Sequence, residues 1–221
     1  MKLDPRIPEP IQPIIKDYLR RTEQRLIGLI HASHIVGSIA LGEFNEHFND
    51  IDFITVLSRK ATPIDLGNLR TIHQSLENTY PKWKMSGSYV QACDLGKLGN
   101  DLRPYLHDHD GKLRPTAHNV INSVRRWELR NCGIPIAGTA SASFLFTVNW
   151  DLLTAEMRDN LNTYWRSWTR QPRLTAVLYT NWGIQWAVLG VLRQYFSFKE
   201  NTITTKVRVC DYVLGSLPHD A

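Results

Sequence analysis

Apolar residues at the start of the chain recur with the period of a helix. Prolines at positions 5, 8, 10 and 13 keep the first segment extended, and Pro10 or Pro13 suits the first turn of a helix. From Ile14 to Ile30, apolar side chains recur near helical spacing with charged residues between them. The pattern predicts one amphipathic helix.

Two strands are predicted next, with a polar loop between them. Residues 34–36 form a short apolar segment that ends at Gly37-Ser38, and residues 51–57 are rich in β-branched side chains. Helical spacing follows over residues 66–80 and stops before a proline, and residues 88–90 can supply a further strand.

The second half of the chain is predicted to be mainly helical. Residues 94–118 are rich in Gly, Asp, His and Pro, which is typical of an irregular excursion. Helical spacing resumes over residues 119–130 and 144–168, and Gln171-Pro172-Arg173 breaks it. Beyond that break, strand character is confined to residues 207–209.

These elements predict an α+β fold in two domains. Residues 1–148 would hold a mixed sheet flanked by helices, and residues 149–221 a helical bundle. The composition agrees, because 43% hydrophobic and 21% charged residues are ordinary for a globular protein and exclude a disordered or fibrous chain.

Cysteine use and the lack of long apolar stretches bear on the location of the protein. Cys93, Cys132 and Cys210 are odd in number and widely spaced, which indicates neither a disulfide scaffold nor a zinc site. The nearly apolar residues 182–192 are too few to span a bilayer, and the proline-containing start does not resemble a signal peptide. We expect a cytoplasmic protein with no membrane partner, as a monomer or weak dimer.

The chain is basic, with a formal charge of +5 and a pI near 9.2, but no run of Lys or Arg exceeds two adjacent residues. The densest pairs, Arg20-Arg21 and Arg125-Arg126, lie in helical patterns, where a solvated face is the usual explanation. A basic pocket for a polyanionic small molecule explains the excess as well as nucleic acid does. The scattered positions make a nucleic-acid partner the less expected of the two.

Asp50 and Asp52 lie on either side of Ile51 at the start of the second predicted strand. Because side chains alternate along a strand, the two carboxylates share one face, about 6.6 Å apart at the backbone. An uncompensated carboxylate pair in an apolar strand is costly through desolvation and repulsion. Mg²⁺ binds few protein carboxylates and completes its coordination with water and substrate phosphates, so the pair predicts a magnesium site for a nucleoside triphosphate.

Gly37-Ser38 is a candidate phosphate site. A glycine at a strand-to-helix turn lets the backbone approach a phosphate, which backbone N–H groups and the Ser38 hydroxyl can bind, and Gly42 keeps the same loop small. Each motif alone has a high false-positive rate. Their joint occurrence, with Gly42 four and Asp50 twelve residues after Ser38, is far more specific.

This combination resembles the DNA polymerase β-like nucleotidyltransferase superfamily, through Gly37-Ser38, Gly42 and the segment Asn49-Asp50-Ile51-Asp52-Phe53. Within the superfamily, the chain is similar to the bacterial aminoglycoside nucleotidyltransferases of the streptomycin/spectinomycin adenylyltransferase type, which have a helical C-terminal domain. Residues 127–138 and 188–206 support the similarity.

The resemblance implies a magnesium-dependent enzyme that transfers AMP from ATP to a hydroxyl group of a small molecule. It implies that Asp50 and Asp52 are the catalytic residues and hold the metal. The implied nucleotide-binding residues are Gly37, Ser38, Asn49 and Lys206. For Lys206, which would reach phosphate from the second domain, a solvated helix lysine is the alternative.

The chain departs from the pattern of these enzymes in three places. They commonly carry a third carboxylate on a neighbouring strand, but residues 84–91 contain no acid and Asp94 lies just beyond them. The acids that would hold a cationic antibiotic are absent from Trp182-Gly183-Ile184-Gln185-Trp186. We therefore predict that Trp182 and Trp186 contact an aromatic or apolar acceptor. The chain ends soon after Leu217-Pro218, where relatives continue into a further helix, as expected of a trimmed or naturally short helical domain.

Two other groups of residues have alternative interpretations. The run His107-Asp108-His109-Asp110-Gly111 could bind a metal, but adjacent ligands in a Gly/Pro-rich loop are more often solvated. The tryptophans could stack on a ligand, although aromatic residues at helical spacing more often belong to a core; they are Trp150, Trp165, Trp168, Trp182 and Trp186.

The leading hypothesis is thus an aminoglycoside-adenylyltransferase-like enzyme with an altered acceptor. Because the third acid is missing, a catalytically weak or inactive relative that binds a nucleotide or a partner protein is the alternative. A nucleic-acid-modifying transferase is a third possibility, which predicts salt-sensitive binding to RNA or DNA.

Overall fold

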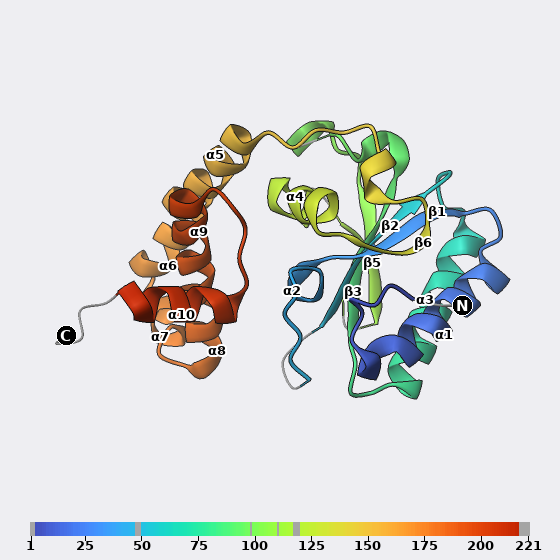
Figure 1. Ribbon diagram of the computed structural model, residues 1–221, viewed down its shortest axis with the longest axis horizontal. Coiled ribbons are helices and arrows are strands. Elements are labelled where there is room, and N and C mark those ends of the chain that lie inside the picture. Colours follow the sequence, from blue (N-terminus) through green and yellow to red (C-terminus); the bar gives the residue numbers. More distant parts are fainter. Residues whose placement is uncertain (1–2, 47–49, 98, 110, 117–119, 217–221) are drawn as a thin grey trace. The chain divides into compact units, whose positions relative to one another are not determined.

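The computed structural model describes residues 3–46, 50–97, 99–109, 111–116 and 120–216 (Figure 1). The chain divides into two compact units, Met1–Val148 and Asn149–Ala221. The described strands form one six-stranded mixed sheet in the first unit, and the described part of the second unit is helical. The predicted α+β fold class is therefore confirmed.

The sheet has the strand order β5-β4-β3-β2-β1-β6. Its strands are β1 (Ile30–Ile35), β2 (Ile51–Leu57), β3 (Met85–Gln91), β4 (Tyr105–His109), β5 (Lys112–Thr116) and β6 (Ile134–Gly138). Strands β2 and β3 are parallel, and the other neighbouring strands are antiparallel. A parallel pair needs a crossover connection, which helix α3 (Pro63–Thr79) supplies.

Helices cover both faces of the sheet. Helices α1 (Gln12–Arg25) and α3 pack on one face, and α4 (Ser123–Asn131) on the other (Figure 1). Along β2, Phe53 and Leu57 belong to the core under α1 and α3, whereas Ile54 and Val56 belong to the core on the α4 side. The predicted alternation along this strand is confirmed, so Asp52 faces α4.

Side-chain caps account for where several helices begin. The Thr62 hydroxyl accepts a hydrogen bond from the Asp65 N–H at 3.2 Å, and the Asp65 carboxylate accepts one from the Thr62 N–H at 2.7 Å. This capping box starts α3, with Pro63 in its first turn. Asn122 caps α4 by a single bond, because its side-chain oxygen accepts from the Arg125 N–H at 3.0 Å.

A chain of hydrogen bonds crosses the core under α1 and α3. The Tyr89 hydroxyl lies 3.1 Å from that of Tyr18 and 2.7 Å from His73 Nε2, and the Tyr18 hydroxyl lies 3.0 Å from Thr55 Oγ1. The Oδ2 atom of Asp108, which is fully buried on β4, lies 3.2 Å from His73 Nδ1. Because buried polar groups are costly without partners, this network fixes how β2, β3 and β4 align with the helices.

The second unit is built from short helices. They are α5 (Trp150–Asn160), α6 (Arg166–Arg170), α7 (Pro172–Val177), α8 (Asn181–Gly183), α9 (Leu189–Glu200) and α10 (Lys206–Ser216). Two π-helical turns, Leu161–Trp165 and Ile184–Val188, follow α5 and precede α9. Over the part of the chain that the structure covers, none of the helices combines the length and the apolar character that a membrane crossing requires.

The structure corrects four sequence-based expectations about these elements. Helix α1 ends at Arg25, because Gly28 takes a left-handed conformation with φ of 68° and Ile30 already belongs to β1. Residues 94–118 contain the hairpin of β4 and β5. Residues 144–149 precede α5 as irregular chain, and residues 207–209 belong to α10 and not to a strand.

Candidate active site

Gly37 opens the short helix α2 (Gly37–Ala40) directly beside Asp52. Its φ of 70° is left-handed, and a Cβ atom added at Gly37 would lie 2.3 Å from Asp52 Oδ2. The N–H of Val36 donates to the carbonyl of Asp52 at 2.9 Å, which joins the end of β1 to the start of β2. The position therefore requires glycine for its backbone conformation and for the closeness of the carboxylate.

The other residues of the predicted motif surround this contact. Ser38 is half-buried in α2, Asp50 is exposed before β2, and Asn49 lies outside the described residues. The Asp52 side chain is 27% exposed, whereas Ile51 between the two aspartates is fully buried. Among the described residues, no three His, Cys, Asp or Glu side chains form a metal cluster. A magnesium ion here would have two carboxylates from the chain and would need its remaining ligands from water and phosphate.

Arg125 and Glu128 of α4 complete the surroundings of Asp52. Nη2 of Arg125 lies 3.0 Å from Asp52 Oδ2, and its Nη1 donates to Glu128 Oε2 at 2.8 Å. The same Glu128 oxygen accepts a hydrogen bond from the N–H of Gly37 at 3.3 Å. A guanidinium thus lies where Asp52 would bind a cation, and a carboxylate where Gly37 would bind a phosphate.

The charge of Arg125 is secured by these partners. Burial alone would lower the pKa of its guanidinium, but the carboxylates of Glu128 and Asp52 raise it above its usual value. The side chain is 28% exposed and that of Glu128 is 5% exposed, so the ion pair is largely removed from water. Separating it would require a strong replacement for each charge.

The prediction of a solvated face for Arg125-Arg126 was wrong. Arg126 is 3% exposed and Arg125 contacts Asp52. Sequence reasoning also missed Glu128 as part of the site. The spacing of Arg125 and Glu128, three residues apart on a helix, was a signal for their ion pair, but nothing local shows that α4 covers the Asp52 face.

Asp94 is the first acid after residues 84–91, where a third carboxylate was sought, but it pairs with other residues. It is 4% exposed, at the end of the 3₁₀ turn Ala92–Asp94, and its carboxylate accepts hydrogen bonds from Arg103 and Lys97. These partners lower its pKa against the opposing effect of burial. Asp94 therefore has a structural role.

The strand positions next to Asp52 carry serine and histidine. In the sheet, Ser86 lies in register with Asp52, and Ser88 with Ile54. The Oγ atom of Ser86 lies 3.2 Å from His109 Nδ1, and that of Ser88 lies 3.0 Å from His107 Nδ1. The expectation that the His107-Asp108-His109 run lies in a solvated loop was wrong. The run belongs to β4, with Asp108 on the α3 face and both histidines on the Asp52 face.

Burial lowers the pKa of His107, and nearby charged and polar groups adjust it further. His109 and Arg125 act in the same direction as burial, whereas the Gly87 backbone and the Asp52 carboxylate oppose it. These influences place the His107 ring within electrostatic reach of both Asp52 and Arg125.

The remaining predicted residues lie in the second unit. Lys206 is the exposed first residue of α10. Trp182, 59% exposed, stacks on Trp186 with the ring centroids 5.1 Å apart and an angle of 14° between the planes. Trp186 also contacts Trp165 and Trp168, with centroids at 4.7 and 4.9 Å. The aromatic cluster is therefore partly a core and partly a surface.

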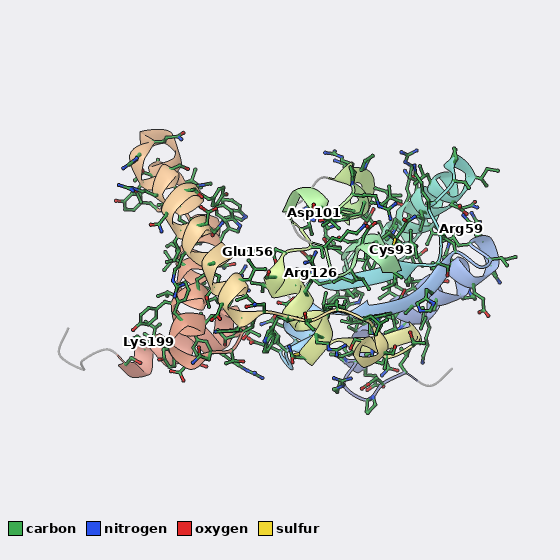
Figure 2. All side chains as sticks on the ribbon, turned by 90° about the horizontal axis from the view of Figure 1, so that it is seen from above. Arg59, Cys93, Asp101, Arg126, Glu156 and Lys199 are labelled. Atoms are coloured by element: carbon green, nitrogen blue, oxygen red, sulfur yellow. The ribbon has the colours of Figure 1, made fainter. Side chains whose placement is uncertain are left out.

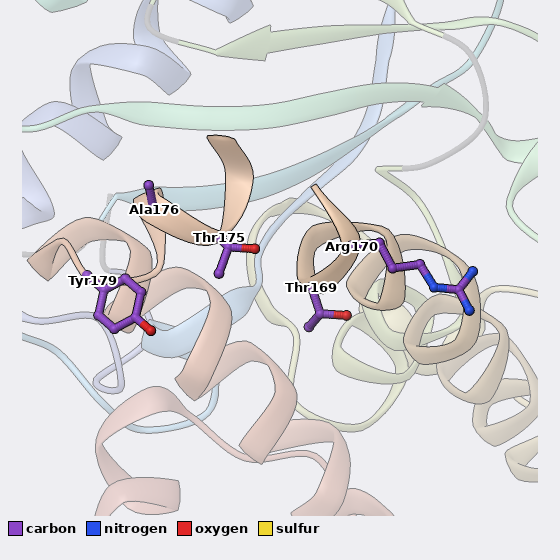
Figure 3. Close-up of a pocket in the computed structure, with 5 residues that line it drawn as sticks. All are labelled: Thr169, Arg170, Thr175, Ala176 and Tyr179. Carbon is purple, nitrogen blue, oxygen red and sulfur yellow. The ribbon is translucent and has the colours of Figure 1, made fainter. Parts of the chain in front are cut away.

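An open pocket of about 530 Å³ lies elsewhere in the second unit, lined by Thr169, Arg170, Thr175, Ala176 and Tyr179 (Figure 3). None of the predicted nucleotide-binding or acceptor-binding residues lines it. Its lining carries one charged side chain and no carboxylate, so it offers no chemistry that resembles the Asp52 site.

The six-stranded sheet, with a Gly-Ser turn after β1 and aspartates at the start of β2, and the helical unit that follows have a fold that a known adenyltransferase shares. In particular, the chain is similar in structure to spectinomycin adenyltransferase AAD(9) from Enterococcus faecialis, whose crystal structure was determined with ATP and spectinomycin. The TM-score is 0.67 at 12% sequence identity, covering 94% of this chain and 84% of that chain. The predicted resemblance in fold is confirmed. No protein-family model and no curated protein matches the sequence.

Proposed function

We propose that the protein is a magnesium-dependent nucleotidyltransferase that transfers AMP from ATP to a hydroxyl group of a small molecule. The observation that carries the proposal is the contact between Gly37 and Asp52, where a Cβ atom at position 37 would lie 2.3 Å from the carboxylate. This contact brings a candidate phosphate site next to a candidate metal ligand, in a fold shared with an adenyltransferase that was crystallised with ATP.

The residues present suit a magnesium ion. The Asp52 carboxylate now faces the Arg125 guanidinium at 3.0 Å, and a magnesium ion would take the place of that cation. Asp50 and Asp52 would hold the ion, which when bound would neutralise negative charge on the triphosphate. The backbone at Gly37 and the Ser38 hydroxyl would bind phosphate oxygens, and Lys206 and Asn49 are further candidates for nucleotide contacts.

The acceptor is proposed to be aromatic or apolar in part. Trp182 is 59% exposed and stacks on Trp186, so the outer face of this pair is open to a planar ligand. Adjacent residues carry no carboxylate that would favour a polycationic antibiotic. The proposed substrate is therefore a small molecule with a hydroxyl group and a flat apolar portion.

A second candidate function is nucleotide or partner binding without turnover. The contacts of Arg125 with Asp52 and of Glu128 with Gly37 favour it, because the chain itself supplies the charges that a metal and a phosphate would supply. For transfer to proceed, the Arg125–Glu128 pair has to move aside or rearrange around the nucleotide.

Thermal unfolding with ATP and MgCl₂ tests the proposal. We expect a magnesium-dependent rise of the melting temperature in the parent protein and none in the double variant Asp50→Asn/Asp52→Asn. Asp101→Asn is a matched control, since Asp101 is exposed in another part of the same unit (Figure 2). A parent protein that shows no magnesium-dependent shift contradicts the proposal.

Pyrophosphate release separates the two candidate functions. The protein is incubated with labelled ATP and a panel of hydroxyl-bearing acceptors that differ in aromatic content and charge. A transferase releases pyrophosphate and labels an acceptor, whereas a nucleotide-binding relative shows the thermal shift and no release.

A further inference from the structure

We propose that His109 is the general base of the transfer, in place of the third carboxylate that residues 84–91 lack. The inference rests on the proposed nucleotidyl transfer and adds the group that takes the proton from the acceptor. It depends on the register of the sheet, on the hydrogen bonds of Ser86 and on the exposure of the His109 ring.

His109 lies on β4, one strand beyond Ser86, which is the β3 residue that pairs with Asp52. Strands β2 and β3 pair Asp52 with Ser86, and strands β3 and β4 pair Gly87 with Asp108. One position further along, Ser86 Oγ lies 3.2 Å from His109 Nδ1. Residues opposite one another on neighbouring strands point to the same face. Asp52, Ser86 and His109 therefore form one row across the α4 face of the sheet.

Ser86 orients the imidazole. Its Oγ donates to the carbonyl of Asp108 at 3.4 Å and lies 3.2 Å from His109 Nδ1. With the serine proton directed to the carbonyl, Ser86 Oγ accepts from Nδ1–H of His109, which leaves Nε2 as the basic nitrogen. The hydroxyl of Ser86 thus selects the tautomer that a base requires.

The neighbours of His109 differ in burial and charge. His107 stacks alongside with the rings 13° from parallel, half-buried and held by Ser88. Lys112 lies in register with His109 on β5. His109 itself is exposed, so an acceptor that arrives from solvent can reach its ring.

The acceptor oxygen forms a bond to the α-phosphorus of ATP, and the bond from that phosphorus to the oxygen that bridges to the β-phosphate breaks. The electron pair of the broken bond leaves with pyrophosphate. The acceptor proton moves to Nε2 of His109 and then to water, which restores the neutral ring.

Proximity can be measured without turnover. With Mn²⁺ and a non-hydrolysable ATP analogue bound, the paramagnetic ion should broaden the ring C–H proton signals of His109, identified by their loss in His109→Gln. The signals of His31, exposed at the far end of β1, should broaden far less. A His109 signal that stays sharp while Mn²⁺ and nucleotide bind overturns the inference.

Turnover then tests the role of the base. We expect His109→Gln to retain the magnesium-ATP thermal shift and to lose about 100-fold or more in pyrophosphate release, as is typical of a removed general base. Free imidazole should restore release in His109→Gly, and Ser86→Glu should restore it in His109→Gln. His31→Gln is the matched control and should retain the parent rate.

The possible failures are distinguishable. A parent protein with neither nucleotide binding nor release contradicts the proposed function and the inference with it. A parent protein that turns over, with a His109→Gln rate within threefold of it, overturns the inference alone. A rate loss in His109→Gly that imidazole does not restore assigns His109 a structural role and likewise overturns it.

Discussion

Nη2 of Arg125 lies 3.0 Å from Oδ2 of Asp52, so the carboxylate most suited to a metal is held by a cation of the chain itself. The same guanidinium donates to Glu128, whose carboxylate accepts from the Gly37 N–H. Metal and nucleotide therefore have to compete with an internal ion pair. The strength of this competition determines how readily the site loads.

Removal of Arg125 should increase the affinity for a divalent cation. In Arg125→Gln we expect the Kd for Mn²⁺, measured by calorimetric titration, to fall about tenfold, which corresponds to about 1.4 kcal/mol of lost competition. Arg103→Gln is the control, because Arg103 pairs with the distant carboxylate of Asp94. Unchanged Mn²⁺ affinity in Arg125→Gln would indicate that the guanidinium does not compete.

The same variant should be less stable, because Glu128 remains buried without its partner. A loss of about 3 kcal/mol in the free energy of unfolding is the usual size for breaking a buried pair. The double variant Arg125→Gln/Glu128→Gln should recover most of that loss in urea titrations. A double variant no more stable than Arg125→Gln would contradict this explanation.

Gly37→Ala separates backbone strain from the clash with Asp52. Gly37 and Gly28 have φ of 70° and 68°, but a Cβ at Gly28 meets no atom within 4 Å. Both alanine variants should lose about 1 kcal/mol of unfolding free energy from the left-handed conformation. Only Gly37→Ala should also lose the magnesium-ATP thermal shift. Equal shifts in the two variants would show that Gly37 has no role beyond its conformation.

His34 should make the protein sensitive to acid. Burial lowers its pKa from 6.5 to about 4, partly offset by the backbone of Thr139. Because the ring binds a proton less readily in the folded protein than in the unfolded chain, acid favours unfolding. The contribution of the neutral ring to the free energy of unfolding is complete above pH 6.5 and is lost as the pH falls towards 4.

At the acid end of this range, protonation of His34 should lower the free energy of unfolding by about 3 kcal/mol. His34→Leu should remove that part of the pH dependence, as measured by urea unfolding at pH 4.5 and pH 7, whereas His31→Gln should retain it. The same acid sensitivity in His34→Leu as in the parent would assign the effect to other groups.

Trp182→Ala tests the proposed acceptor surface. We expect the KM for a flat aromatic acceptor to rise about tenfold, because the lost stacking interaction is worth about 1.4 kcal/mol. The magnesium-ATP thermal shift should stay unchanged. Tyr179→Ala is the control, since Tyr179 is 83% exposed beside the open pocket. A rise in KM that is equal in both variants would argue against a specific role for Trp182.

Much of the Gly37 and Asp52 arrangement could be predicted from sequence, because it is local. The alternation around Ile51 follows from the period of two in the side chains of a strand, and the glycine of Gly-Ser marks where the preceding strand ends. The approach of Gly37 to Asp52 was expected from these patterns. The position of Arg125 was not, because it depends on where α4 packs on the sheet, 73 residues beyond Asp52 in the chain.

The hairpin of β4 and β5 could not be predicted for a related reason. Its polar residues do not show the apolar alternation of a half-buried strand, since His107 and His109 lie on the Asp52 face and Asp108 is buried with its Oδ2 atom 3.2 Å from His73 Nδ1. Tertiary partners there override local propensity. Residues 94–118 do not look like strands in the sequence because β4 carries polar side chains on both of its faces.

The buried link from Asp108 to His73 also has a consequence for how the hairpin tolerates change. Neighbouring residues on β4 point to opposite faces, so a slip of one residue would direct both imidazoles into the apolar interior and the aspartate towards Arg125. The acid anchors the strand against that slip from the reverse side of the sheet. An insertion or deletion within Tyr105–His109 should therefore be far more harmful than one in the turn between the two strands.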